Sequence, residues 1–191
     1  TQFSSVCEPN NFGTQAPCYA PNNYNGEFKG PINLRSALAQ SLNIPAVKVL
    51  YLTSIKDAIR LASDMGITTL NDPDRLGLTL VLGGGEVRLL EHTAAYGVFA
   101  NDGVRARQRS ILRIEDAQGN IIVENDIQEE RVLEENVARM INDVLSDSVA
   151  RFPLWQGYSG VSFPNRDVAL KSGSTNNLRD AWIMGYAPNI A

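Results

Sequence analysis

Apolar residues recur at helical spacing through most of the chain, and two strand-like runs follow near its end. Asn33 precedes the first helical pattern and is a suitable N-cap, because its side chain can accept a hydrogen bond from a free backbone N–H. Asn43 and Pro45 interrupt this pattern, and Pro45 suits the first turn of a second helix over residues 46–52. The sequence therefore predicts two helices that meet at residues 41–43, where side chains can point into a cleft.

A third predicted helix begins at Ser54, which forms a capping-box-like start with Asp57, and it ends at Gly66. The pattern also predicts helices over residues 87–101 and 134–149, a hairpin with strands 111–115 and 121–124, and final strands over 168–174 and 181–186. Helices followed by a hairpin sheet are typical of the α+β class, or of a mixed α/β fold with an antiparallel sheet.

The composition is that of an ordinary globular domain, with 43% hydrophobic and 20% charged residues in a chain of 191. A net charge of -4 argues against a nucleic-acid partner, whose binding surface would be basic. Arg105, Arg107 and Arg109 are alternate charges that we expect on the solvated face of a strand. No apolar stretch approaches the ~18 residues that suggest a membrane span. The N-terminal residues show no signal-peptide pattern, and we expect the chain to come from the middle of a longer protein.

The two cysteines, Cys7 and Cys18, lie in residues 1–32, a predicted loop region rich in proline and asparagine. One interpretation is a local disulfide that closes this loop, which implies an oxidising, extracytoplasmic compartment. The other is a pair of free thiols in a cytosolic protein. A metal site would need more Cys or His ligands, and His92 is the only histidine in the chain. We therefore expect no metal centre and no cofactor.

The sequence gives little support for histidine-assisted serine chemistry or for a phosphate loop. His92 has no companion for a Ser-His-Asp triad, and no Gly-x-Ser-x-Gly elbow is present. Gly83-Gly84-Gly85 precedes a helix, but no Gly-Lys-Ser/Thr follows, and Arg88 stands where a dinucleotide fingerprint has its last glycine. A turn between two elements is the favoured interpretation of these glycines.

Lysine-assisted serine chemistry remains, because an ammonium beside a hydroxyl can stabilise negative charge or transfer a proton. Lys171 lies among apolar residues in a predicted strand, where it needs a partner or a route to solvent. Gly173 allows close backbone approach, which suits a strand that pairs with an extended peptide. Ser172 and Ser174 project from one face of this strand, and their hydroxyls beside an ammonium can form a seat for a carboxylate. On its own, this motif fits a surface strand with a solvated lysine better.

The surrounding residues closely resemble class A penicillin-binding proteins. Residues 30–47, which include Ser-Leu-Asn at 41–43, resemble the region around that family's Ser-x-Asn motif. The Lys-Ser-Gly-Ser run at 171–174 and the strand after it resemble the family's Lys-Thr-Gly strand and its neighbour, with serine in place of the usual threonine. Residues 95–104 are similar to the segment before the family's inserted hairpin. These segments follow one another in the family's order.

This resemblance implies a penicillin-binding transpeptidase fold, related to that of serine β-lactamases, with helices packed on an antiparallel sheet. Members of the family cross-link peptidoglycan through a serine acyl-enzyme, and β-lactams acylate the same serine. The implied partners are peptidoglycan stem peptides and β-lactams, in an extracytoplasmic location. A membrane anchor is expected only upstream of this chain.

The resemblance also implies roles for individual residues. Ser41 would relay a proton towards the leaving amine, and Asn43 would hydrogen-bond the substrate and steady the lysine partner of the nucleophile. Lys171 would position Ser41 and supply positive potential, and the backbone N–H of Ser174 would form half of an oxyanion hole. The residues expected to bind the substrate are Ser172, Gly173 and Ser174.

The family's nucleophile motif, a serine followed three residues later by a lysine, occurs nowhere in the sequence. We therefore expect residues 1–191 to be the C-terminal part of a transpeptidase domain, incomplete at both ends, with a Cys-containing loop over 1–32 and an inserted hairpin near 109–125. The isolated chain is expected to be inactive. Two alternatives remain: a DD-carboxypeptidase or β-lactam-hydrolysing relative, and a non-catalytic sensor that binds stem peptides or β-lactams.

Overall fold

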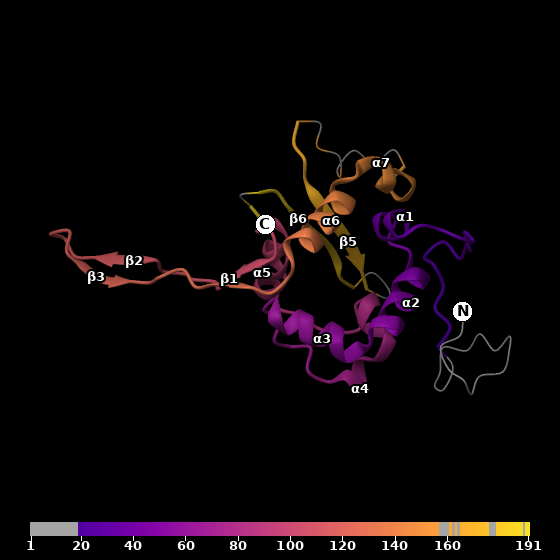
Figure 1. Cartoon of the computed structure of the whole chain (residues 1–191), viewed down its shortest axis with the longest axis horizontal. Helices are drawn as coiled ribbons and strands as arrows, with labels where there is room; N and C mark the ends of the chain where they lie inside the picture. The colour runs from indigo at the N-terminus through magenta and orange to yellow at the C-terminus, as the bar shows by residue number, and fades with distance from the viewer. Residues whose placement is uncertain (1–18, 157–160, 162, 164, 176–178, 189) are drawn as a thin grey trace.

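The chain folds around a central helix, α5 (Leu89–Ala100), and a two-stranded ribbon formed by β5 (Ala169–Ser174) and β6 (Ala181–Tyr186) (Figure 1). The computed structural model describes residues 19–156, 161, 163, 165–175, 179–188 and 190–191. Cys7 and Cys18, and with them the predicted disulfide, lie outside the described residues. None of the described helices combines the length and the apolar composition that a transmembrane helix needs. The predicted class, mixed helix and antiparallel sheet, is confirmed.

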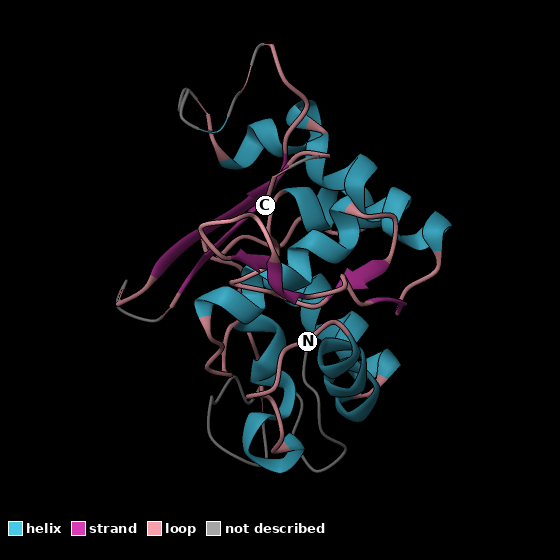
Figure 2. Cartoon of the chain, turned by 90° about the vertical axis from the view of Figure 1, so that its left-hand side faces the viewer, coloured by secondary structure: helices cyan, strands magenta, loops and turns pink. Residues whose placement is uncertain are grey.

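The β5–β6 ribbon carries helices on one of its faces. The strands are antiparallel, with Ala169 opposite Tyr186 and Lys171 opposite Met184, so these four side chains share a face. In Figure 2 most of the helices lie to one side of the two long strands. A buried cluster joins the ribbon to α6 (Glu135–Ser146) and consists of Leu145, Ala169 and Tyr186, with Tyr96, Phe99, Ala100 and Ile141 packed against it. Burial of this apolar surface fixes the position of the strand that bears Lys171.

Helix α5 takes part in a second apolar cluster, so it joins two parts of the molecule. The buried members of this cluster are Met65, Ala95 and Val98, and the residues packed against them are Ile67, Phe99, Val132 and Leu133. Phe99 contacts both clusters, and Val98 is fully buried. Removal of these side chains from water is the main stabilising term for the arrangement of α5.

The helices α1 (Leu34–Ala39) and α3 (Ile55–Asp64) begin where their polar caps predict. Asn33 accepts a hydrogen bond from the N–H of Ser36 at 2.8 Å, and Ser54 accepts one from the N–H of Asp57 at 3.2 Å. The helix between them, α2 (Asn43–Thr53), begins three residues before the predicted start. Pro45 fits inside its first turn because the N–H groups there have no intrahelical acceptor.

The segment after α3 contains two short helices that the sequence did not predict, α4 (Pro73–Leu76) and the 3₁₀-helix η1 (Gly77–Leu82). The glycines that follow form a turn, as expected. Gly83 has a φ of +93°, and a Cβ added to Gly84 would lie 2.4 Å from Oγ1 of Thr79. This close approach requires glycine in the turn.

A narrow arm projects from the body of the molecule (Figure 1). Its base is the antiparallel pair of β1 (Val104–Ala106) with β4 (Glu129–Arg131), and its tip is the pair of β2 (Arg113–Glu115) with β3 (Ile121–Glu124). The β2–β3 hairpin confirms the prediction, and Asp116 stabilises its turn by accepting bonds from the N–H groups of Gln118 and Asn120. The β1–β4 pair was not predicted.

The predicted helix over 134–149 is divided in the structure, because α6 ends at Ser146 and α7 (Ser148–Arg151) begins after Asp147. The Asp147 carboxylate accepts a bond from the N–H of Ala150 at 2.8 Å and so caps α7. A single 3₁₀ turn, η2 (Phe152–Leu154), follows. This break matters for the site, because the carboxylate at the break also contacts α1.

Candidate functional site

Ser41 lies in the turn that ends α1, in a backbone conformation usually adopted by glycine. Its φ is +54°, in the left-handed region that costs other residues roughly 1–2 kcal/mol. The N–H of Ser41 bonds the carbonyl of Leu38 at 3.1 Å, and the N–H of Leu42 bonds that of Ala37 at 3.0 Å. These two bonds form a Schellman motif with serine in place of glycine. Backbone strain of this kind is typical of functional sites.

Asn43 begins α2 on the other side of the buried Leu42. Its side-chain amide donates to the backbone carbonyl of Asn22 at 2.8 Å, and the Asn23 side chain accepts a bond from the N–H of Ile44 at 3.2 Å. Asn23 is buried and caps α2 from a preceding loop, since Leu42 at the cap position has no side-chain oxygen. No sequence motif predicted a role for Asn22 or Asn23, and the only signal was the asparagine-rich composition of the loop.

Lys171 contacts Ser41, although 130 residues separate them in the sequence. Nζ of Lys171 donates to Oγ of Ser41 at 2.6 Å and to the backbone carbonyl of Ser172 at 2.6 Å. Burial lowers the pKa of Lys171 from 10.5 to about 8, because the charged form loses hydration. The two motifs, far apart in the chain, therefore form a single lysine–serine pair.

This pair can transfer a proton. A serine hydroxyl has one proton to donate and two lone pairs that accept. The bond from Lys171 uses a lone pair of Ser41, so the hydroxyl proton remains available to a basic atom placed beside it. After the hydroxyl has given up its proton, an ammonium whose pKa is near 8 donates a new proton to Ser41 more readily than an ammonium whose pKa is 10.5. The geometry therefore suits protonation of a leaving group through the Ser41 hydroxyl.

The β5 strand offers a backbone edge beside this pair. Strand alternation places Lys171 and Gly173 on the helix-packed face and Ser172 and Ser174 on the opposite face, so the two serine hydroxyls lie outside the Lys171–Ser41 contact. A Cβ added to Gly173 would meet no heavy atom within 4 Å, which shows that packing does not require glycine there. Within the described part of the chain, β5 pairs only with β6. An unpaired strand edge can accept an extended peptide as a further strand.

Arg35 joins the helix that carries Ser41 to the α6–α7 junction, a role that sequence reasoning missed. Its guanidinium donates to the carboxylates of Asp143 and Asp147, the latter at 3.0 Å, and to the backbone carbonyl of Asp143 at 3.2 Å. Both carboxylates raise the pKa of Arg35. Because α6 packs on β5, this contact links the positions of Ser41 and Lys171.

We predict that Arg35→Gln raises the pKa of Lys171 above about 8, because α1 would no longer hold Ser41 over the ammonium and water would reach it. NMR titration of the chain with isotope-labelled lysine measures this change. The matched control is Arg75→Gln, which removes an arginine–glutamate pair between Arg75 and Glu86, outside the site. If the pKa of Lys171 is unchanged in Arg35→Gln, the contacts of Arg35 with Asp143 and Asp147 do not position the Lys171–Ser41 pair.

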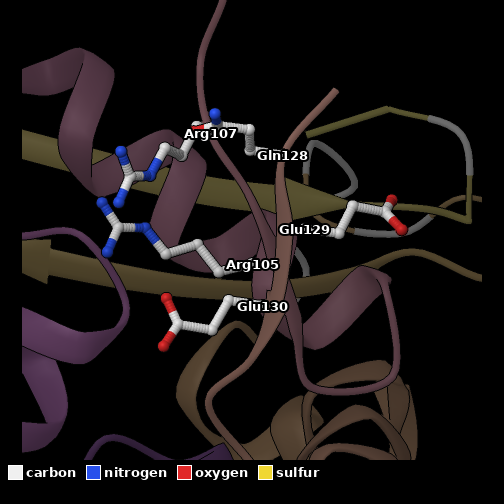
Figure 3. Close-up of a pocket in the computed structure, with 5 residues that line it drawn as sticks. All are labelled: Arg105, Arg107, Gln128, Glu129 and Glu130. Atoms are coloured by element: carbon white, nitrogen blue, oxygen red, sulfur yellow. The ribbon is translucent and has the colours of Figure 1, made fainter. Parts of the chain in front are cut away.

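His92 and a hollow at the base of the arm are two other candidate regions. The His92 ring packs against Tyr96 and Trp182, with ring centroids 5.2 and 5.4 Å away, and burial lowers its pKa. A hollow of about 220 Å³ at the base of the arm is lined by Arg105, Arg107, Gln128, Glu129 and Glu130 (Figure 3). Arg105, expected on a solvated face, instead donates to the carbonyl of Asp64 at the end of α3, at 3.1 Å. Arg107 is exposed, as expected.

Comparison with known sequences identifies relatives over nearly the whole chain. Residues 5–190 match the family model described as "Penicillin binding protein transpeptidase domain". Penicillin-binding protein 1A of Clostridium acetobutylicum is 30% identical over 93% of this chain and 22% of its own length. Penicillin-binding protein 1A of Aquifex aeolicus is 34% identical over 90% of this chain and 23% of its own length. Penicillin-binding protein 2D of Bacillus subtilis is 33% identical over 91% of this chain and 25% of its own length. The chain thus spans about a quarter of the length of these curated relatives.

Solved structures show the same fold. Penicillin-binding protein 1A of Haemophilus influenzae matches 97% of this chain and 32% of its own with a TM-score of 0.74 at 20% identity. An imipenem acyl-enzyme complex of penicillin-binding protein A from M. tuberculosis matches 87% of this chain and 42% of its own chain, with a TM-score of 0.69 at 19% identity. Fold, motif order and the family match over residues 5–190 agree, and the chain belongs to the penicillin-binding protein transpeptidase domain family.

Proposed function

We propose that the chain forms part of a peptidoglycan DD-transpeptidase, in which Lys171 and Ser41 protonate the leaving amine of a D-Ala-D-Ala stem. The observation that carries this proposal is the 2.6 Å bond from the buried Lys171 ammonium to the Ser41 hydroxyl. Asn43, fixed by its bond to Asn22, contacts the substrate and the lysine that accompanies the nucleophile. The family membership supports this assignment of roles.

The substrate peptide extends along the open edge of β5 in this proposal. Gly173 leaves room beside the strand. The terminal carboxylate reaches the Ser172 and Ser174 hydroxyls across this edge, on the face opposite the one that carries Lys171. The backbone N–H of Ser174 supplies one donor of the oxyanion hole. β-Lactams occupy the same place, in accord with the imipenem and ceftriaxone acyl-enzyme complexes described for a structural neighbour.

The nucleophilic serine of this proposal lies outside residues 1–191, because no serine of the sequence has a lysine three positions later. The acyl-enzyme forms on that serine, and Ser41 and Lys171 assist departure of the amine. Isolated residues 1–191 are therefore inactive, and they constitute the C-terminal part of the transpeptidase domain. The 109–125 segment, with its projecting hairpin, is an insertion in that domain.

Incubation of the longer polypeptide with a stem pentapeptide and an acceptor amine tests the reaction. We expect release of D-Ala together with a cross-linked product, detected by mass spectrometry. Hydrolysis of the pentapeptide to a tetrapeptide, with no cross-linked product, would show that the polypeptide is a DD-carboxypeptidase and not a transpeptidase. Binding of the peptide without release of D-Ala would identify a non-catalytic sensor and contradict the proposal.

The proposed location is extracytoplasmic, where a bond between Cys7 and Cys18 would persist. We predict that the chain, purified from an oxidising compartment and denatured without reductant, has no thiol that reacts with Ellman's reagent. The same sample after reduction is the control and should give two thiols, because the sequence contains two cysteines. Two reactive thiols before reduction would contradict the bridge.

A further inference from the structure

A polar pocket lies between the α6–α7 junction and the segment that leads into β5. Its volume is about 250 Å³, and the residues that matter here are Ser148, Arg151, Arg166 and Asp167. None of these residues belongs to the two motifs, and the pocket has no part in the proposed proton transfer.

Arg151 is the distinctive member of this pocket. It is only 6% exposed, yet among the described residues its guanidinium has a single hydrogen-bond acceptor, the backbone carbonyl of Leu145, at 2.5 Å from Nη1. Burial without an ion-pair partner lowers its pKa. A guanidinium has five N–H donors, so most of its donors remain unused by the described residues. None of its nitrogens is among the buried, unpartnered side-chain atoms of the described residues, so the remaining donors reach the pocket, where an anion can accept hydrogen bonds from them.

The carboxylates near Arg151 do not complete it. Asp147 is the acidic group that acts on its pKa, but one carboxylate oxygen caps α7 and the other accepts from Arg35. Asp167 lines the pocket and forms no ion pair with either arginine among the described residues. The remaining donors of Arg151 are therefore available to an anion from outside the chain.

The segment that leads into β5 supplies a second cation to the pocket lining. Arg166 is exposed, its backbone N–H bonds the carbonyl of Phe163 at 3.2 Å, and its guanidinium has no partner in the described part of the chain. Ser148, also exposed, adds a hydroxyl. Two arginines against one carboxylate leave the pocket positive, and planar guanidinium groups match the paired oxygens of carboxylates and phosphates.

We propose that this pocket binds a small oxyanion, a carboxylate or a phosphate group, held between Arg151 and Arg166. The bound anion would connect α7 to residue 166, three positions before β5. It would thereby steady the entry to the strand that carries Lys171. This site is independent of the proposed transpeptidase function. If the pocket binds no anion, the proposed function is unaffected.

Isothermal titration of the chain with inorganic phosphate and, separately, with acetate tests the site at constant ionic strength. We expect saturable binding at one site, weakened about tenfold or more by Arg166→Gln, because a charge-assisted hydrogen bond is lost. The matched control is Arg60→Gln, an exposed arginine on α3, which should bind as the unmodified chain does. The tighter of the two anions identifies the class of ligand.

Arg151→Met should abolish binding, with circular dichroism to confirm that the variant is folded. If this variant unfolds, Arg166→Gln alone decides the matter, because Arg166 is exposed. Absence of saturable binding for both anions would overturn the proposal. So would an equal loss in Arg60→Gln and Arg166→Gln, since it would indicate a general charge effect.

Discussion

Lys171→Met is expected to lower the rate of acylation by a β-lactam about 10²–10⁴-fold in the longer polypeptide that carries the nucleophile. The variant removes the proton source that bonds Oγ of Ser41 and the positive charge beside the leaving group. Methionine has a similar length, so packing changes little. Stopped-flow measurement with a chromogenic cephalosporin gives the rate. A rate within about threefold of the unmodified protein would remove Lys171 from the mechanism.

The pH dependence of acylation separates the two contributions of this lysine. Burial places the pKa of Lys171 at about 8, so the ammonium form is lost as the pH rises through 8. Acylation that depends on the ammonium should fall over the same range. Lys171→Arg keeps the charge but cannot lose a proton, and its activity, though reduced, should not show that fall.

The same lysine should make the stability of the chain increase between pH 8 and pH 10.5. The pKa in the folded state, about 8, is below the value of 10.5 for an exposed lysine. Between these values the unfolded chain binds more protons, so the free energy of unfolding rises with pH. The maximum gain is about 3 kcal/mol, and below pH 8 the full cost of the buried charge is present.

Lys171→Met should therefore be more stable than the unmodified chain at pH 7, by roughly 1–3 kcal/mol, and should lack this pH dependence. Urea unfolding at pH 7 and pH 9.5 measures both effects. The control is Lys48→Met, which replaces an exposed lysine of α2. Equal pH slopes in the unmodified chain and Lys171→Met would show that Lys171 is not buried in its charged form.

Local patterns predicted much of the secondary structure. Helices α1 and α3 begin at Asn33 and Ser54 because each residue caps its own helix. The start of α2 escaped prediction because its cap comes from Asn23, twenty residues earlier, through a tertiary contact. The β1–β4 pair escaped because Glu129–Arg131 has no apolar alternation and its pairing depends on the arm as a whole.

Resemblance to the family selected Ser41, Asn43 and Lys171, and the roles assigned to them stay predictions. The structure brings Ser41 and Lys171 into contact, and Ser172 and Ser174 occupy alternate positions of β5. The 2.6 Å contact between Lys171 and Ser41 depends on packing of α1, α6 and β5, which no short window of sequence contains. The left-handed backbone of Ser41 and the bond from Arg35 to the Asp147 carboxylate depend on the same packing.

Residues 1–191 and the longer polypeptide are labelled side by side with a fluorescent penicillin, to test whether this chain supplies the lysine–serine pair while the nucleophile lies elsewhere. We predict no covalent adduct on the 191-residue chain, and one adduct on the longer polypeptide, at a serine outside residues 1–191. Stoichiometric labelling of the 191-residue chain, or no labelling of the longer polypeptide, would contradict the account.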